Sequence, residues 1–301
     1  MTGYILADGK VKMSVFEGNK VSGINSSVIS PELCVLLGEA AGTVCDSRIG
    51  VAFSGGNVGE AMKNAFVVGA QSTGATVMDF GSVMESEAVF AISALGLGLS
   101  VFITGGPVCS LRFLGAGGNN APQETVRKIE EVMTLGKFKR CCWNEYVKPT
   151  DINGIKLLYR RELYSGAPDG LSTLCAVPQC EDKRGLELFT DTLKRLGCNT
   201  EKGNIYRLSA DGLSLSVEGP EVGVLGPKRV TVLSCGAEFE RHNDVAVPSD
   251  APCEIEALAA KYARRVYRMG EIYAANDPLA RAQYRIRDGI ITAVRLMPFY
   301  H

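Results

Sequence analysis

The sequence lacks several features that would assign it to a specialised class of protein. None of its apolar runs reaches the roughly 18–20 residues of a membrane-spanning helix. The N-terminal stretch MTGYILADGKVKM has no basic segment followed by an apolar one, so we expect no signal peptide. The formal net charge of −1 gives no global field that would attract nucleic acid or an anionic membrane. We therefore expect a cytoplasmic protein with neither nucleic-acid nor membrane partners.

The usual pattern of a zinc site is also missing. Only His242 and His301 are available, and none of the 10 cysteines belongs to a C-x-x-C pair. Most of the cysteines lie inside apolar segments, which favours reduced thiols that pack as small hydrophobic side chains. A short basic cluster, Lys137, Lys139 and Arg140, stands beside Trp143, but the rest of the chain is not basic enough to indicate a nucleic-acid surface.

The first half of the chain has the rhythm of an α/β fold. Ser30-Pro31-Glu32 is typical of a helix start, with a capping hydroxyl, a proline in the first turn and an acid beside it. Continuous apolar strands then alternate with amphipathic helices, which predicts a parallel sheet covered on both faces. The expected strands are 50–53, 75–80 and 99–104, and the expected helices are 58–73, 85–95 and 122–135.

The second half contains shorter α/β units. The turn-forming stretch SGAPDG at 165–170 is the best boundary between domains. We predict domains at 1–166, 167–210 and 211–301, the second one shortened. The expected strands are 174–177, 205–209, 213–217, 229–234 and 266–269, and the expected helices are 151–164, 184–196, 253–265 and one that begins at Asp288.

Several segments, in the right order, resemble the α-D-phosphohexomutases, the phosphomannomutase/phosphoglucomutase family. They are FEGNKVSG (16–23), VFITGG (101–106), CSLRFLGAGG (109–118), SADGLSLSVEG (209–219) and YRIRDGIITAVRL (284–296). The resemblance implies three-layer α/β/α domains with mixed, mostly parallel sheets. It also implies a fourth, phosphate-binding domain, for which we find no counterpart in this sequence.

The resemblance places a phosphoserine loop after the strand that ends at Thr104. Here Thr104 is followed by Gly105 and Gly106, and the loop is shorter than the family's. Ser110 is the nearest hydroxyl and the only weak candidate for a phosphate donor. It has no histidine or carboxylate beside it in sequence that could act as its base.

The metal-binding loop of the family has three aspartates, and here Asp211 alone remains, as a vestigial ligand. Arg207 stands in place of the first acid. Mg²⁺ prefers several oxygen ligands with carboxylates among them, so we expect no cofactor, or Mg²⁺ only if the protein is active.

Residues that could still bind a phosphate are spread over three segments. Gly55 and Gly56 lie between a strand and a helix, where backbone N–H groups can hold an anion. Thr104, Gly105 and Gly106 form the shortened turn, Arg112 stands where the family has a lysine, and Glu271 remains of the sugar-reading segment.

Three hypotheses about function are open at this point. The first is a degenerate phosphohexomutase-like pseudoenzyme that binds a hexose phosphate or has a regulatory role. The second is an active phosphomannomutase/phosphoglucomutase with a rearranged site, in which Ser110, Asp211 and Glu271 come together. The third is an interaction protein that pairs with an intact mutase or with a second copy of itself.

Overall fold

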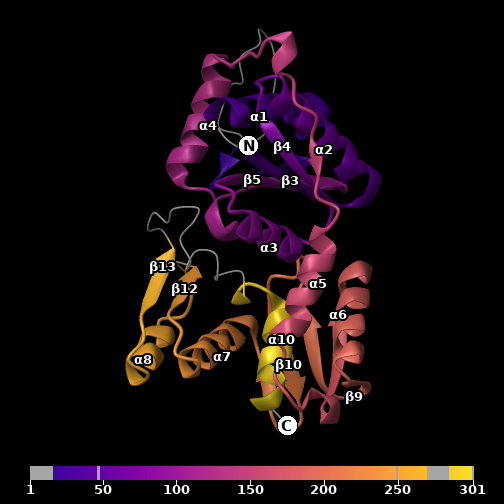
Figure 1. Cartoon of the computed structure of the whole chain (residues 1–301), viewed down its shortest axis with the longest axis vertical. Coiled ribbons are helices and arrows are strands. Elements are labelled where there is room, and N and C mark those ends of the chain that lie inside the picture. Colours follow the sequence, from indigo (N-terminus) through magenta and orange to yellow (C-terminus); the bar gives the residue numbers. More distant parts are fainter. Residues whose placement is uncertain (1–15, 46–47, 249, 270–284, 300–301) are drawn as a thin grey trace. The chain divides into compact units, whose positions relative to one another are not determined.

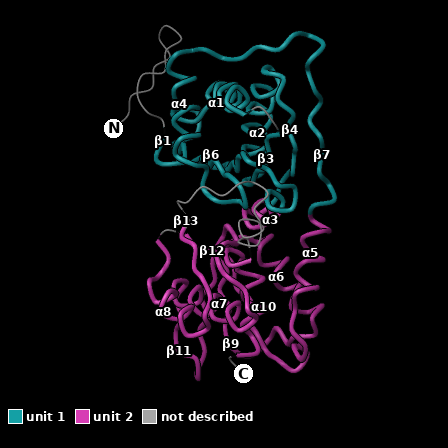
Figure 2. The backbone as a smooth tube through the Cα atoms, turned by 60° about the vertical axis from the view of Figure 1, so that its left-hand side comes forward, with its two compact units in different colours: residues 1–83, 91–155, 274–276 teal, residues 84–90, 156–273, 277–301 magenta. Residues whose placement is uncertain are grey.

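The computed structural model describes residues 16–45, 48–248, 250–269 and 285–299 (Figure 1). The chain divides into two compact units. Unit 1 contains the chain up to Val83 and residues 91–155, and unit 2 contains residues 84–90 and most of the chain from Lys156 onward (Figure 2). The domain boundaries after residues 166 and 210 stay a prediction.

Unit 1 is built on a mixed sheet that has seven strands within the described residues, in the order β1-β2-β6-β5-β3-β4-β7. The parallel βαβαβ core predicted from the sequence is confirmed, because β3 pairs in parallel with both β4 and β5. β6 is antiparallel to β5 and to β2. The strands are β1 (Phe16–Glu17), β2 (Lys20–Ile24), β3 (Arg48–Ser54), β4 (Thr76–Ser82), β5 (Leu99–Thr104), β6 (Val108–Leu114) and β7 (Thr150–Asp151).

Helices α1 (Pro31–Val44), α2 (Gly56–Gln71) and α4 (Gln123–Leu135) share one core with this sheet. Leu37 of α1 and Phe66 of α2 are fully buried there with Ile103 and Phe113 of the sheet. The sequence signal at the start of α1 is realised, because Ser30 accepts a hydrogen bond from the Leu33 backbone N–H at 3.3 Å. Helix α3 (Glu85–Leu95) joins β4 to β5.

The connector after α4 is held to unit 1 along its length. Arg140 pairs with the buried Glu39 at 2.5 Å, and the Val147 carbonyl accepts a hydrogen bond from Gln71 at 2.8 Å. The connector contains a 3₁₀ turn at Trp143–Glu145, from which the indole of Trp143 is 89% exposed. Because Arg140 is paired with Glu39, its charge is not available to the basic cluster that it forms in the sequence with Lys137 and Lys139.

Unit 2 contains a second sheet in the order β11-β10-β9-β8, again within the part of the chain that the structure describes. Its strands are β8 (Cys175–Cys180), β9 (Asn199–Leu208), β10 (Leu215–Gly219) and β11 (Gly223–Leu225). Helices α5 (Ile155–Ser165), α6 (Lys183–Arg195) and α10 (Gly289–Leu296) belong to the same unit. α6 packs on β8 and β9, and α10 packs on β9 and β10. Short 3₁₀ helices lie at Ala116–Gly118, Leu171–Thr173 and Met297–Phe299.

A parallel pair, β12 (Val245–Pro248) and β13 (Val266–Met269), packs with α7 (Pro227–Glu240) and α8 (Glu254–Lys261). The predicted strand at 229–234 is wrong, because these residues lie in α7. Its β-branched residues favour a strand, but Pro227 stands at the first helical position. The helix also packs against β10 and α10 as well as α8 and β12, so it shows no one-sided apolar pattern.

Candidate functional site

Two glycine turns meet at the carboxyl edge of the first sheet. Ser54, the last residue of β3, is the register partner of Thr104, the last residue of β5. The Gly105 N–H donates to the Ser54 carbonyl at 3.0 Å. Gly55 adopts a left-handed conformation with φ of 85° and leads directly into α2. The structure therefore brings together the two turns that the sequence singled out, at Gly55-Gly56 and at Thr104-Gly105.

The Gly105 turn packs directly on the first turn of α2. A Cβ atom on Gly105 would lie 2.1 Å from the Gly59 nitrogen, and one on Gly55 would lie 2.1 Å from the Gly105 carbonyl oxygen. Such distances leave no room for a side chain at either position. The two backbones are in close contact at the edge where the resemblance places a phosphoserine loop.

Ser110 and Arg112 lie on one face of β6, beside other polar residues. Ser110 stands opposite Thr104 of β5 and opposite Ser22 of β2. Directly opposed residues on antiparallel strands share a face, so Ser22, Ser110 and Thr104 form a row of hydroxyl side chains. Arg112 stands opposite Lys20 in the next row. These residues are half-buried, whereas the alternate residues Cys109 and Leu111 face the core.

This placement gives Ser110 no base among its direct cross-strand neighbours. Thr104 and Ser22 carry hydroxyl groups, which do not accept a proton at neutral pH. Gly106, the last residue of the shortened turn, accepts a hydrogen bond from the Cys109 thiol at 3.4 Å. Glu271, the predicted remnant of the sugar-reading segment, lies outside the described residues.

Asp211 lies in a tight turn between β9 and β10 in unit 2. Its Oδ1 accepts hydrogen bonds from the Ser209 hydroxyl at 2.5 Å and from the Leu213 N–H at 3.0 Å. The turn is completed by Gly212, whose φ of 77° favours glycine. The Gly212 carbonyl in turn accepts from the Gly289 N–H at 2.9 Å. The carboxylate thus stabilises its own turn.

The residues around Asp211 do not fit Mg²⁺. One of its oxygens already accepts two hydrogen bonds, and Arg207 pairs with Glu218 at 3.5 Å. In the portion of the chain that the structure describes, no three His, Cys, Asp or Glu side chains gather as a set of metal ligands. A divalent ion that prefers several charged oxygen ligands finds a single committed carboxylate at this turn.

A buried acid that the sequence analysis did not single out lies close by in the same unit. Asp288 is 1% exposed and caps α10, accepting hydrogen bonds from the N–H groups of Ile290 and Ile291 at 2.9 Å each. It also accepts from the Tyr159 hydroxyl at 2.6 Å. Burial raises the pKa of Asp288 to about 6, although its hydrogen bonds oppose the rise. The only signal in the sequence was its expected place at the start of a helix.

A second buried acid, Glu87 of α3, has its own partners. It is 3% exposed, accepts from the Met84 N–H at 2.8 Å and pairs with Arg184 of α6 at 3.0 Å. The negative charge of Glu87 contributes to the raised pKa of Asp288. Both acids therefore serve the packing of unit 2. Within the described residues, the structure has no helix that is both long and apolar enough to cross a membrane.

Comparison with known proteins gives two partial matches in sequence. No protein-family model matches the chain. A segment of 122 residues, 39% of the chain, is 30% identical to a probable phosphoglucosamine mutase of Thermococcus kodakarensis. A segment of 135 residues, 43% of the chain, is 25% identical to a probable phosphoglucosamine mutase of Thermococcus gammatolerans. These matches cover 27% and 30% of the two relatives, which is less than a third of their length.

A crystal structure extends the likeness over nearly the whole chain. A phosphoglucomutase/phosphomannomutase family protein of Burkholderia thailandensis superposes with a TM-score of 0.72 at 15% identity, over 94% of this chain and 76% of that one. The fold is thus that of the phosphohexomutases. The sequence likeness to the phosphoglucosamine mutases is confined to less than half of this chain, and the likeness of fold extends over 94% of it.

Proposed function

We propose that this protein is a phosphohexomutase-like pseudoenzyme of hexose phosphate metabolism, which binds a hexose phosphate without transferring its phosphoryl group. The observation that carries the proposal is the turn Thr104-Gly105-Gly106. It closes on the backbone of α2 at the sheet edge where the resemblance places the phosphate donor. The backbone of this short turn lies where the longer loop of the family would carry its serine.

The loss of phosphoryl transfer has a further chemical basis. Phosphoryl transfer needs an aligned nucleophile and a cation that neutralises the developing charge. Ser110 has only hydroxyl groups directly across from it on both neighbouring strands. Asp211 is committed to its own turn. The alternative, an active mutase with Ser110 as its donor, would need both features to change.

Binding of a hexose phosphate is supported by the polar face of the first sheet. Ser22, Ser110 and Thr104 offer hydroxyl groups, which suit the hydrogen-bonding pattern of a sugar. Lys20 and Arg112 lie in the adjacent row, and a guanidinium is a good partner for phosphate oxygens. The left-handed turn at Gly55-Gly56 lies at the same edge of the sheet.

The test combines a binding measurement with an assay of turnover. Purified protein is incubated with glucose 1-phosphate or mannose 1-phosphate, Mg²⁺ and a hexose bisphosphate activator. We expect no 6-phosphate product. We expect the same sugar phosphates to raise the melting temperature, since a ligand at about 100 times its dissociation constant adds about 2.7 kcal/mol to stability.

The matched variants are Ser110→Ala and Arg112→Gln. Arg112→Gln should weaken the thermal shift, whereas Ser110→Ala should leave the absence of turnover unchanged. Product formation by the wild-type protein that disappears in Ser110→Ala would establish an active mutase in place of the pseudoenzyme. A melting temperature unaffected by any hexose phosphate would refute the binding role.

A further inference from the structure

An open hollow of about 540 Å³ lies in unit 2, on the outer side of α5. It is lined by Leu157, Arg160, Arg161, Tyr164 and Ser165 of α5 and by Arg195 of α6. The spacing of Leu157, Arg160 and Tyr164, at i, i+3 and i+7, places these three residues on one face of the helix. The opposite face of α5 is buried through Tyr159 and Leu163. The volume falls in the range of small-molecule sites.

The hollow is strongly cationic, and its positive charge is only partly neutralised. Arg195 pairs with Asp191 of its own helix at 3.2 Å. Among the described residues, the exposed Arg160 and Arg161 have no ion-pair partner. The pKa of Lys156, one residue before Leu157, is lowered by burial and also by the charges of Arg184 and Arg160.

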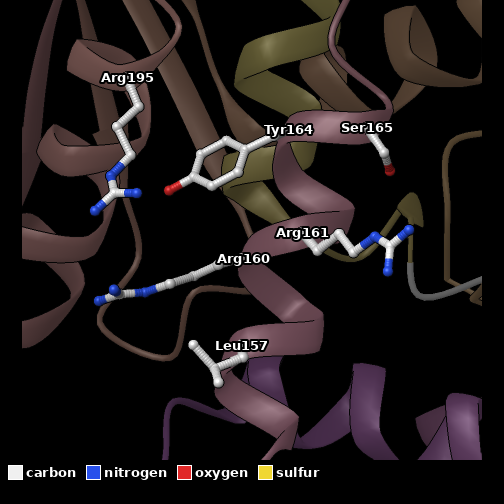
Figure 3. A pocket seen from close by; sticks show the side chains of 6 residues that line it. All are labelled: Leu157, Arg160, Arg161, Tyr164, Ser165 and Arg195. Atoms are coloured by element: carbon white, nitrogen blue, oxygen red, sulfur yellow. The ribbon is translucent and has the colours of Figure 1, made fainter.

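The hydroxyl of Tyr164 provides a second, independent indication of a ligand. Its oxygen is buried and has no hydrogen-bond partner within the described part of the chain. Arg195 lies over the Tyr164 ring, with its guanidinium carbon 5.9 Å from the ring centre. In Figure 3 the side chains of Arg160, Tyr164 and Arg195 extend to the same side of α5, whereas Arg161 and Ser165 extend to the other. A buried donor without an acceptor costs free energy unless a partner is supplied.

We propose that Arg160, Tyr164 and Arg195 form a binding site for the phosphate group of a phosphomonoester that carries an apolar or aromatic substituent. The guanidinium groups neutralise the dianion and offer paired N–H donors. The Tyr164 hydroxyl, which is buried in this structure, donates to one phosphate oxygen after a rotation of its side chain into the hollow. Leu157, which is 72% exposed, and the Tyr164 ring provide the apolar surface for the substituent.

The proposed ligand class follows from the mixture of side chains. A free inorganic ion would use the arginines and leave Leu157 in water. A neutral aromatic compound would leave two cations and the Tyr164 hydroxyl unsatisfied. A phosphate ester with a ring uses both halves of the hollow. The site lies entirely on α5 and α6 and is independent of the polar face on β2, β5 and β6 that carries the proposed function.

Calorimetric titration of the full chain with phenyl phosphate, at low ionic strength, tests the site. Inorganic phosphate and phenol are titrated in parallel as the two halves of the probe. We expect phenyl phosphate to bind more tightly than either half. Arg160→Gln and Arg195→Gln should each weaken phenyl phosphate binding about tenfold, and Tyr164→Phe about threefold, in line with charged and neutral hydrogen bonds.

Two control variants separate this site from other sources of anion binding. Arg127→Gln removes a comparable exposed arginine from α4, and Arg112→Gln perturbs the polar face of the first sheet. Arg127→Gln should leave the affinity for phenyl phosphate unchanged, and Arg112→Gln should remove at most a second, separate binding event at the first sheet. Equal affinity in all variants, or a loss confined to Arg112→Gln, would overturn the assignment. Equal affinity for phenyl phosphate and inorganic phosphate would overturn the ligand class. Unchanged far-UV circular dichroism in each variant ensures that a loss reflects binding.

Discussion

At the scale of single residues, the charged groups inside this protein have specific structural tasks. Asp288 caps α10 and accepts a hydrogen bond from the Tyr159 hydroxyl. Inside unit 1, Lys63 of α2 pairs with Asp79 of β4 at 2.5 Å. Removing one member of such a pair leaves an uncompensated buried charge, which costs more than the pair itself contributes. These residues are visible in the sequence as ordinary acids and lysines. Their burial depends on contacts between distant segments, which no local pattern reveals.

The raised pKa of Asp288 makes stability depend on pH. Its pKa is about 6 in the folded chain, above the ordinary value of 3.8 for an aspartic acid side chain, because burial disfavours the charged form. Between these two values the folded state holds the proton more tightly than the unfolded state. The contribution of Asp288 to the free energy of unfolding is therefore largest at low pH and falls as the pH rises to about 6, by an amount on the order of 3 kcal/mol.

Urea unfolding of the wild-type protein and of Asp288→Asn at several pH values between 4 and 7 measures this effect. The asparagine does not titrate, so the difference between the two curves isolates the Asp288 carboxyl group. We expect the wild-type protein to lose stability relative to the variant as the pH rises. A difference that is flat, or that changes in the opposite sense, would show that the hydrogen bonds of Asp288 outweigh its burial.

At the scale of elements, the strongest local patterns predicted the fold well. The bounds expected for the helix at 85–95 and the strand at 99–104 coincide with those of α3 and β5. The pattern failed at α7, where a helix buried on more than one side has no one-sided periodicity. At the candidate site, the sequence indicated two glycine turns. It did not show that their backbones touch, because that contact joins positions some fifty residues apart, at Gly55 and Gly105.

The contact of the Gly105 turn with α2 predicts a clear difference between two glycine substitutions. Gly105→Ala would place a Cβ atom 2.1 Å from the Gly59 nitrogen, so the backbone must shift, at a cost of about 1–3 kcal/mol. Gly98→Ala has no atom within 4 Å of the new Cβ and should lie within about 1 kcal/mol of the wild-type protein. Chemical denaturation of both variants provides the measurement. Equal stabilities would mean that the turn is free to move away from α2.

At the scale of the whole molecule, the fold could be predicted from the sequence, whereas the candidate binding residues could be predicted only in part. The ordered segments predicted a phosphohexomutase fold, which the structural comparison confirms. The sequence singled out Ser110 and Thr104 separately and did not indicate Ser22, because the grouping of these three residues in one row depends on strand register. No sequence motif indicates the cationic hollow on α5. The hollow forms because Arg195 of α6 lies beside residues of α5.

The structure around Asp211 predicts that Mg²⁺ contributes nothing to the stability of the folded chain. A ligand that binds the folded state raises its melting temperature, and this turn offers one carboxylate whose Oδ1 is already used. Thermal unfolding in excess EDTA and in excess Mg²⁺ should therefore give the same melting temperature. A reproducible rise with Mg²⁺ would contradict this, and repeating the measurement on Asp211→Asn would show whether that carboxylate is the ligand.

The assignment of residues 84–90 to unit 2 has a consequence for how the chain acquires its structure. This short stretch is flanked on both sides by chain that belongs to unit 1. Its Glu87 pairs with Arg184, which is synthesised 97 residues later. During translation, residues 84–90 therefore cannot form their contacts with unit 2 until Arg184 has been synthesised, whereas the flanking segments of unit 1 can already fold. Contacts of such long sequence separation slow folding, so unit 2 should be completed last and should depend most on protection from premature association.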